Sequence, residues 1–316
     1  MNYIVFDLEW NQCPYGKNRE VKTLPFEIIE IGAIKLNKDR KYVDRFHKII
    51  KPIVYPKLHF RTKEIVHLDQ DTLKKGTLFP DALREFLSWA GTESQFCTWG
   101  TVDLVELQRN MKYYGLLSLL KGPLHYYDLQ KLFAVSYEDM KKRRSLEYGI
   151  DFLKLEKVLD FHRALSDAWY TAEIFRKIDM NVVLSYDSID VYQNPKTKKE
   201  EIYAVYNGYS KFISREFNTK EEAMEDNEVL KIHCCFCDRS AKKKLRWFSV
   251  NSKNYYCIAI CPVHGYIKGK ARMKRTEEGR VYVVKTIKMS SEMEAKEIRE
   301  KKMNCGKILK KRHTIP

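Results

Sequence analysis

The sequence predicts an α/β protein in which helices flank a mixed sheet, followed by a small β-rich module at the C-terminal end. Three observations support this prediction. Strand-like segments fill most of the first fifty residues and precede a series of helical patterns. Five of the eight cysteines crowd into residues 234–261, and the last quarter of the chain is strongly basic. At 316 residues and 44% hydrophobic content, the chain can bury two cores.

The first domain is expected to span residues 1–180. Residues 2–10 are β-rich, and their alternation places Asp7 and Glu9 on one face with Tyr3 and Val5. Further strands are expected at 27–36, 41–50 and 95–99, and helices after Pro80, after Asp103, and at 127–133, 145–153 and 164–178.

The remainder is expected to form two parts. Residues 181–230 are predicted to be a connecting α+β segment without an assigned role, in which residues 189–192 and 202–206 pair as a hairpin. Residues 231–316 are predicted to form the β-rich module, with strands at 255–260 and 281–287 and a final helix.

The positive charge is concentrated at the C-terminal end. Residues 239–316 contain 22 Lys and Arg but 6 Asp and Glu, a net charge of +16 that equals the charge of the whole chain. Aromatic residues interleave with these cations, which predicts a nucleic-acid partner; a lysine-rich surface kept for solubility is the alternative. Without a long apolar run or a signal peptide, the protein is expected to be cytoplasmic and to have no membrane partner.

Four carboxylates and a histidine form a candidate catalytic centre. Asp7 and Glu9 share one face of a hydrophobic strand, where their burial is costly unless a divalent cation balances them. Asp103 and Asp167 each stand near the start of a helix, and His162 precedes Asp167 by five residues. Four carboxylates carry the charge to hold two Mg²⁺ ions for phosphodiester hydrolysis, and a histidine can accept the proton. A solvated strand end and a helix-capping histidine are the alternatives.

The segments that carry these residues are Phe6-Asp7-Leu8-Glu9-Trp10, Glu30-Ile31-Gly32-Ala33, Trp99-Gly100 with Asp103, and His162 to Ala168 followed by Thr171-Ala172. They resemble the three exonuclease motifs of the DEDDh (DnaQ-like) superfamily, whose members are 3′-to-5′ exonucleases with a ribonuclease H-like fold. The resemblance covers residues 2 to about 180. Within the superfamily, the chain is most similar to the RNA-directed branch that includes KapD and the histone-mRNA exonucleases.

The resemblance implies a role for each motif residue. Two catalytic ions, Mg²⁺ or Mn²⁺, would be held by Asp7, Glu9, Asp103 and Asp167. His162 would be the general base, and the products would be nucleoside 5′-monophosphates released from a 3′ end. Contacts with the terminal nucleotide are expected from Leu8, Trp10 and Asn11.

The expected substrate is single-stranded RNA or an RNA 3′ end. A DNA exonuclease of the repair or proofreading type is the alternative within this class, and a nucleic-acid-binding scaffold with a vestigial nuclease domain is the alternative outside it. One segment departs from many relatives: Thr62-Lys63-Glu64-Ile65 stands where they have Thr-Gly-Ile.

The clustered cysteines predict one structural Zn²⁺. Cys234 and Cys237 form one ligand pair, and 23 residues later Cys261 and His264 form a second, the spacing of a zinc ribbon. Cys257 and Cys235 are the alternative ligands. We expect zinc to hold the basic module in shape against nucleic acid, with the docking of a protein partner as the alternative role.

Overall fold

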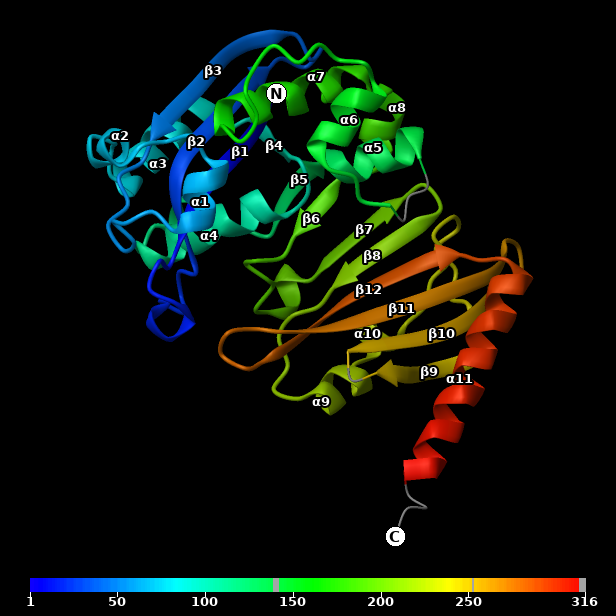
Figure 1. Ribbon diagram of the computed structural model, residues 1–316. Coiled ribbons are helices and arrows are strands. Elements are labelled where there is room, and N and C mark those ends of the chain that lie inside the picture. Colours follow the sequence, from blue (N-terminus) through cyan, green and yellow to red (C-terminus); the bar gives the residue numbers. More distant parts are fainter. Residues whose placement is uncertain (139–141, 252, 313–316) are drawn as a thin grey trace. The chain divides into compact units, whose positions relative to one another are not determined.

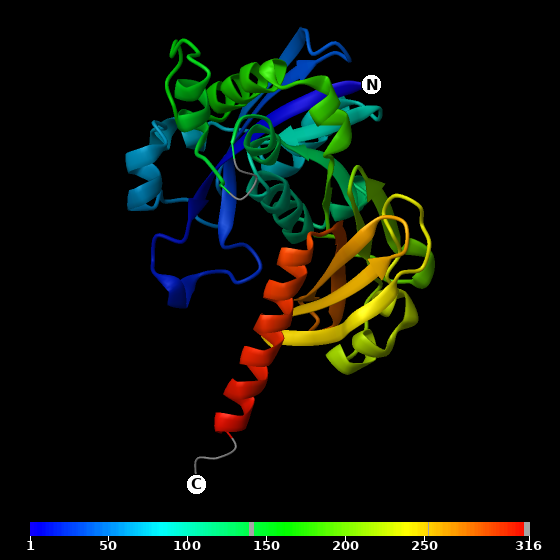
Figure 2. The same cartoon turned by 90° about the vertical axis from the view of Figure 1, so that its right-hand side faces the viewer.

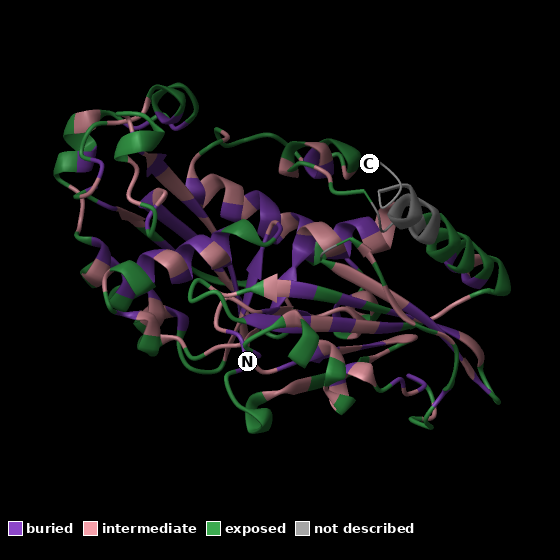
Figure 3. Ribbon diagram, turned by 90° about the horizontal axis from the view of Figure 1, so that it is seen from below, coloured by how far each residue is buried: buried purple, intermediate pink, exposed green. Residues whose placement is uncertain are grey.

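The computed structural model describes residues 1–138, 142–251 and 253–312 and divides the chain into two compact units, Met1–Gln193 and Asn194–Pro316. Each unit contains a six-stranded sheet (Figure 1). Buried residues lie along most strands of the two sheets and in the helices that pack on them (Figure 3). Among the described residues, no helix is long and apolar enough to span a bilayer.

The first unit is built on a mixed sheet with strand order β3-β2-β1-β4-β5-β6. β1 pairs antiparallel with β2 and parallel with β4, so the predicted mixed sheet is confirmed. The strands are β1 (Asn2–Gln12), β2 (Phe26–Leu36), β3 (Tyr42–Ile49), β4 (Ser94–Thr98), β5 (Leu124–Asp128) and β6 (Ser188–Asp190).

Helices cover both faces of this sheet and enclose two cores. Ile4, Phe6 and Leu8 of β1 belong to the core shared with α3 and α4, whereas Tyr3 and Val5 belong to the core shared with α5, α6 and α7. The predicted alternation is therefore confirmed, and it directs Asp7 and Glu9 to the α7 face. The helices are α1 (Phe60–Ile65), α2 (Gln70–Lys74), α3 (Phe79–Ala90), α4 (Val102–Tyr113), α5 (Leu129–Tyr137), α6 (Leu146–Phe152), α7 (Ala164–Lys177) and α8 (Met180–Ser185), with 3₁₀ turns at Lys17–Arg19 and Leu117–Leu119.

The second unit is an antiparallel sheet with strand order β7-β8-β12-β11-β10-β9. Helix α11 packs on β9, β10 and β11 through Ala295 and Ile298, and its C-terminal half extends beyond the sheet (Figure 2). The elements are β7 (Ile202–Tyr206), β8 (Tyr209–Ile213), α9 (Lys220–Glu225), α10 (Asn227–Leu230), β9 (Lys242–Asn251), β10 (Asn254–Cys261), β11 (Gly265–Arg275), β12 (Val281–Met289) and α11 (Glu292–Arg312), with a 3₁₀ turn at Lys198–Glu200.

The structure places the unit boundary differently from the sequence. Residues 188–190 pair with β5 of the first sheet, and β7 pairs with β8, so the hairpin predicted between 189–192 and 202–206 is wrong. Residues 202–213 supply two of the six strands of the second sheet. The C-terminal unit is therefore larger than the predicted module, and it has apolar cores of its own.

Candidate active site and cysteine–histidine cluster

Three of the predicted carboxylates converge on one face of the first sheet. Asp7 and Glu9 project from β1, and Asp167 comes from the first turn of α7. One oxygen atom of each carboxylate lies within 4.8 Å of the others, a spacing that suits a shared cation. The Oδ1 atom of Asp167 is buried and has no hydrogen-bond partner among the described residues, as expected for an atom that is available to a metal ion.

Asp103 completes the set from the first turn of α4. It is buried, and the backbone N–H groups of Asp103 and Leu8 act to lower the pKa of its carboxyl, although burial outweighs them. It stands outside the group of three defined by the 4.8 Å spacing, but its charge is the strongest single charge acting on Asp7. The structure thus brings together all four carboxylates that the sequence singles out.

The four carboxylates repel one another in a site with little solvent. Burial raises the pKa of Glu9 to about 8, that of Asp103 to about 7 and that of Asp167 to about 6. Burial and the charges of Asp103, Glu9 and Asp167 raise the pKa of Asp7 well above its usual range. Without a counter-charge, these groups therefore resist full ionisation at neutral pH. A donor set of carboxylate oxygens that needs positive charge fits divalent cations such as Mg²⁺ or Mn²⁺.

His162 lies at the edge of the carboxylate cluster. It is exposed, and its backbone has a left-handed conformation with φ of 60°. The proximity of its ring lowers the pKa of Asp167, although burial outweighs this effect. The ring is therefore accessible to solvent and close to the carboxylates, as a proton acceptor must be.

The N-terminus of α7 is fixed by very close packing on β2. A Cβ atom on Gly32 would lie 2.1 Å from the backbone nitrogen of Leu165, so only glycine permits this approach. Gly32 is directly opposite Asp7 in the strand register. The missing side chain thus places α7, with Asp167, against the strand that carries Asp7.

A buried ion pair next to this contact was not predicted. Glu30 is fully buried opposite Glu9; Arg163 binds it through Nε and one terminal nitrogen, and the Nε2 atom of His47 lies 2.6 Å from it. Burial alone would raise the pKa of Glu30, but the hydrogen bonds from His47 and Arg163 outweigh it and lower the pKa. A lone glutamate within a hydrophobic strand is the sequence signal that points to such a partner.

The residues expected to contact the terminal nucleotide have different environments. Leu8 is buried, and Trp10 is half-buried and packs against Phe26. Asn11 is fully buried: its amide donates to the carbonyls of residues 55 and 57, and its Oδ1 accepts from the N–H of residue 59. The side chain of Asn11 therefore holds a loop, and only Trp10 retains substantial exposed surface for a ligand.

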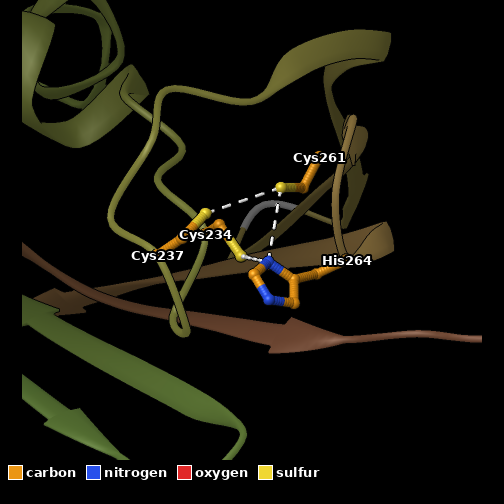
Figure 4. Close-up of side chains that lie close together, drawn as sticks. All are labelled: Cys234, Cys237, Cys261 and His264. Carbon is orange, nitrogen blue, oxygen red and sulfur yellow. Dashed lines mark hydrogen bonds between the residues drawn. The ribbon is translucent and has the colours of Figure 1, made fainter.

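A second cluster lies in the C-terminal unit. Cys234, Cys237, Cys261 and His264 place one ligand atom each within 4.8 Å of the others (Figure 4). The Sγ atoms of Cys237 and Cys261 are 3.7 Å apart, and the Nδ1 atom of His264 is 3.4 Å from Cys234 Sγ and 3.7 Å from Cys261 Sγ. Cys257 and Cys235 are buried outside this group of four.

Comparisons with known proteins agree with the geometry of the first unit. The family model described as Exonuclease matches residues 4–175. The protein named "Probable 3'-5' exonuclease KapD" of Bacillus subtilis is 26% identical over 187 residues, which cover 56% of this chain and 84% of that protein. The PolC-type DNA polymerase III of Caldanaerobacter subterraneus is 29% identical over 210 residues, which cover 64% of this chain but 14% of the polymerase.

Solved structures show lower similarity. The nuclease domain of 3'hExo, described as a DEDDh family member bound to rAMP, is 20% identical with a TM-score of 0.47, covering 56% of this chain and 90% of that domain. The cell-death related nuclease CRN-4 is 18% identical with the same TM-score of 0.47, covering 60% of this chain and 66% of that one. Because the Exonuclease model matches more than half of the sequence and includes all five motif residues, the chain belongs to this exonuclease family, within the DEDDh superfamily.

Proposed function

We propose that the protein is a divalent-metal-dependent 3′-to-5′ exonuclease that removes nucleoside 5′-monophosphates from RNA. The observation that carries this proposal is the convergence of Asp7, Glu9 and Asp167 within 4.8 Å, with Asp103 buried beside them and His162 exposed at the edge. Each raised pKa means that the ionised carboxylate destabilises the folded state at neutral pH. A cluster of mutually repelling carboxylates therefore does not serve stability. It is useful in a site that binds cations.

The residues of the site are proposed to have different roles in phosphodiester hydrolysis. Asp7, Glu9, Asp103 and Asp167 would hold two ions, Mg²⁺ or Mn²⁺, which supply charge stabilisation at the reacting phosphate and an acidified water when bound. His162 would accept the proton of the attacking water at a ring nitrogen, and its exposure allows the proton to pass to solvent.

RNA is proposed as the substrate because of the similarity to KapD and the resemblance of the motifs to the RNA-directed branch. The similarity to PolC-type DNA polymerases makes a DNA exonuclease the second candidate. Trp10, with its half-buried ring, is proposed to contact the terminal nucleotide. A cytoplasmic location remains a prediction of the sequence.

The cysteine–histidine cluster is proposed to hold one structural Zn²⁺. A tetrahedral site with Zn–S of about 2.3 Å and Zn–N of about 2.0 Å has S···S edges of roughly 3.8 Å and S···N edges of roughly 3.5 Å. The distances of 3.7 Å between Cys237 and Cys261 and of 3.4 and 3.7 Å from His264 are close to these values. All four positions are taken by protein ligands, which leaves none for chemistry and favours a structural role.

The edge of the second sheet is proposed to capture the substrate. Lys242, Lys243, Lys244 and Arg246 are all exposed on β9, the last strand of its sheet. Among the residues that the structure describes, none of these four has a carboxylate within ion-pair distance. Unpaired cations on an edge strand also protect against strand addition, but the excess of positive charge near them favours phosphate binding. A protein partner for this unit is the alternative.

The decisive experiment is the digestion of 5′-labelled RNA and DNA oligonucleotides of one sequence, single- and double-stranded, with Mg²⁺ or Mn²⁺. We expect stepwise shortening of single-stranded RNA from its 3′ end, and its loss in Asp7→Ala. Asp71→Ala is the control, because Asp71 is an exposed acid paired with Lys74 on α2. Normal activity of Asp7→Ala would contradict the mechanism. Faster shortening of DNA would favour the repair-type alternative, and RNA that is bound but not shortened would favour the scaffold.

A further inference from the structure

A buried tyrosine holds the segment that precedes His162. Residues 153–163 connect α6 to α7 without forming a helix or strand. Tyr170, on α7, is fully buried, and its hydroxyl donates to the carbonyl of Leu159 at 2.9 Å and accepts from the N–H of Leu159 at 2.8 Å. One hydroxyl group thus satisfies both backbone groups of a residue three positions before His162.

The ring of Tyr170 adds a second contact. It stacks on Phe161 with ring centroids 5.2 Å apart and an interplanar angle of 20°. Phe161 directly precedes His162, and Arg163, which directly follows it, is bound to the buried Glu30. The conformation of His162 is therefore determined by anchors on both sides, in agreement with its left-handed backbone, which a free histidine rarely adopts.

We propose that Tyr170 is a positioning residue for the exonuclease reaction: its hydroxyl fixes the segment before α7 so that the His162 ring stays where it accepts a proton. This inference rests on the proposed function. The competing explanation is that Tyr170 only satisfies buried backbone groups and contributes to general stability. The two differ in whether the loss of the hydroxyl acts through His162.

A double-mutant cycle distinguishes them. In Tyr170→Phe, which keeps the ring, we expect kcat to fall about tenfold, as for the loss of one or two hydrogen bonds, with KM changed by less than about twofold. In a His162→Ala background, the same change should have no further effect on the residual rate, because the group being positioned is gone. Equal factors in the two backgrounds would overturn the proposal, and so would an unchanged kcat in the single variant.

Tyr137→Phe is the matched control. The hydroxyl of Tyr137 donates to the backbone carbonyl of Lys177 at 2.8 Å, at the opposite end of α7 from His162. The Tyr137→Phe variant also removes a hydrogen bond from a tyrosine hydroxyl to a backbone carbonyl, but far from His162. We therefore expect its kcat to stay close to that of the wild type. A fall as large as that in Tyr170→Phe would show that the effect is not local and would overturn the proposal.

Hydrogen exchange provides a readout that needs no activity. In Tyr170→Phe, the amide of Leu159 should exchange faster than in the wild type, whereas Tyr137→Phe should leave its rate unchanged. Unchanged exchange at Leu159 would overturn the positioning role. If the wild type itself shortened no oligonucleotide, the proposed function would fail, while this measurement would still decide whether Tyr170 holds the segment.

Discussion

Replacing Gly32 with alanine should separate the two halves of the catalytic centre. The added Cβ would lie 2.1 Å from the nitrogen of Leu165, 2.2 Å from the carbonyl carbon of Ala164 and 2.4 Å from the Cα of Leu165. These are backbone atoms, so no side-chain rotation relieves the contact. To increase the distance of 2.1 Å to 3.4 Å, the shortest ordinary contact, α7 and β2 must move apart by about 1.3 Å.

This shift moves Asp167 relative to Asp7, which is paired with Gly32 in the strand register. A misplacement of about 1 Å costs about 100-fold in rate, and overpacking costs about 1–3 kcal/mol of stability. We therefore expect kcat of Gly32→Ala to fall about 100-fold in the oligonucleotide assay. The affinity for Mn²⁺, measured by calorimetry, should weaken with it.

Gly76→Ala separates the effect on the site from the effect on stability. A Cβ on Gly76 would lie 2.7 Å from the backbone nitrogen of Lys51, also a backbone clash, but in a loop after α2. Thermal unfolding should show a loss of stability in both variants, and kcat should fall only in Gly32→Ala. A folded Gly32→Ala protein with kcat within about twofold of the wild type would refute the reasoning.

Three further predictions concern the second unit. Elemental analysis should find one equivalent of zinc in the wild type and in Cys257→Ser, whose altered residue lies outside the cluster, but none in Cys234→Ser. Replacing both Lys243 and Lys244 with glutamine should reduce the slope of log affinity for RNA against log salt by about 1.4, or about 0.7 for each phosphate contact; an unchanged slope would contradict capture at β9. Burial lowers the pKa of Lys285 to about 8 from 10.5, so the unfolded state binds more protons above pH 8. The stability contributed by this residue should rise with pH between about 8 and 10.5, and urea unfolding of Lys285→Met should lack that rise.

The alternation of apolar and polar residues predicts the strands whose two faces differ in burial, such as β1. The alternation in β1 was strong enough to assign every side chain from Tyr3 to Glu9 to its face, because one-residue shifts would expose a whole row of apolar groups. The strand β5 is not predicted because it is only 5 residues long, and the 3-residue β6 is predicted with the wrong partner because its pairing depends on tertiary contacts. Residues of β5 were assigned instead to the start of a helix.

The hairpin error has a specific cause. The predicted hairpin places its turn near Asn194-Pro195, whereas Asn207-Gly208 is the stronger turn signal between two β-rich segments. Gly208 has φ of 82° and connects β7 to β8. The sequence therefore contains the signal for this turn, and the pairing of β7 with β8 follows from it.

The reactive groups of the candidate site can be predicted from the sequence, but the residues that hold these groups in position cannot. Asp7 and Asp167 are recognisable from the sequence because burying a carboxylate among apolar residues is costly unless a cation or hydrogen bonds compensate it. The contribution of Tyr170 depends on a hydrogen bond to a loop eleven residues away, which no spacing rule reveals. Asn11 shows the converse, since its position next to the first motif suggested a ligand contact and its amide is occupied by backbone groups.

The Oδ1 atom of Asp167, which has no hydrogen-bond partner in the described part of the chain, has a consequence for how long the folded protein persists in the cell. Cations that bind the folded chain and not the unfolded one add their binding energy to the folding equilibrium. Depletion of the ions should therefore stop catalysis, and it should also leave molecules that unfold more often and are degraded sooner. The supply of divalent ions would then govern how much of the enzyme persists as well as how fast it works.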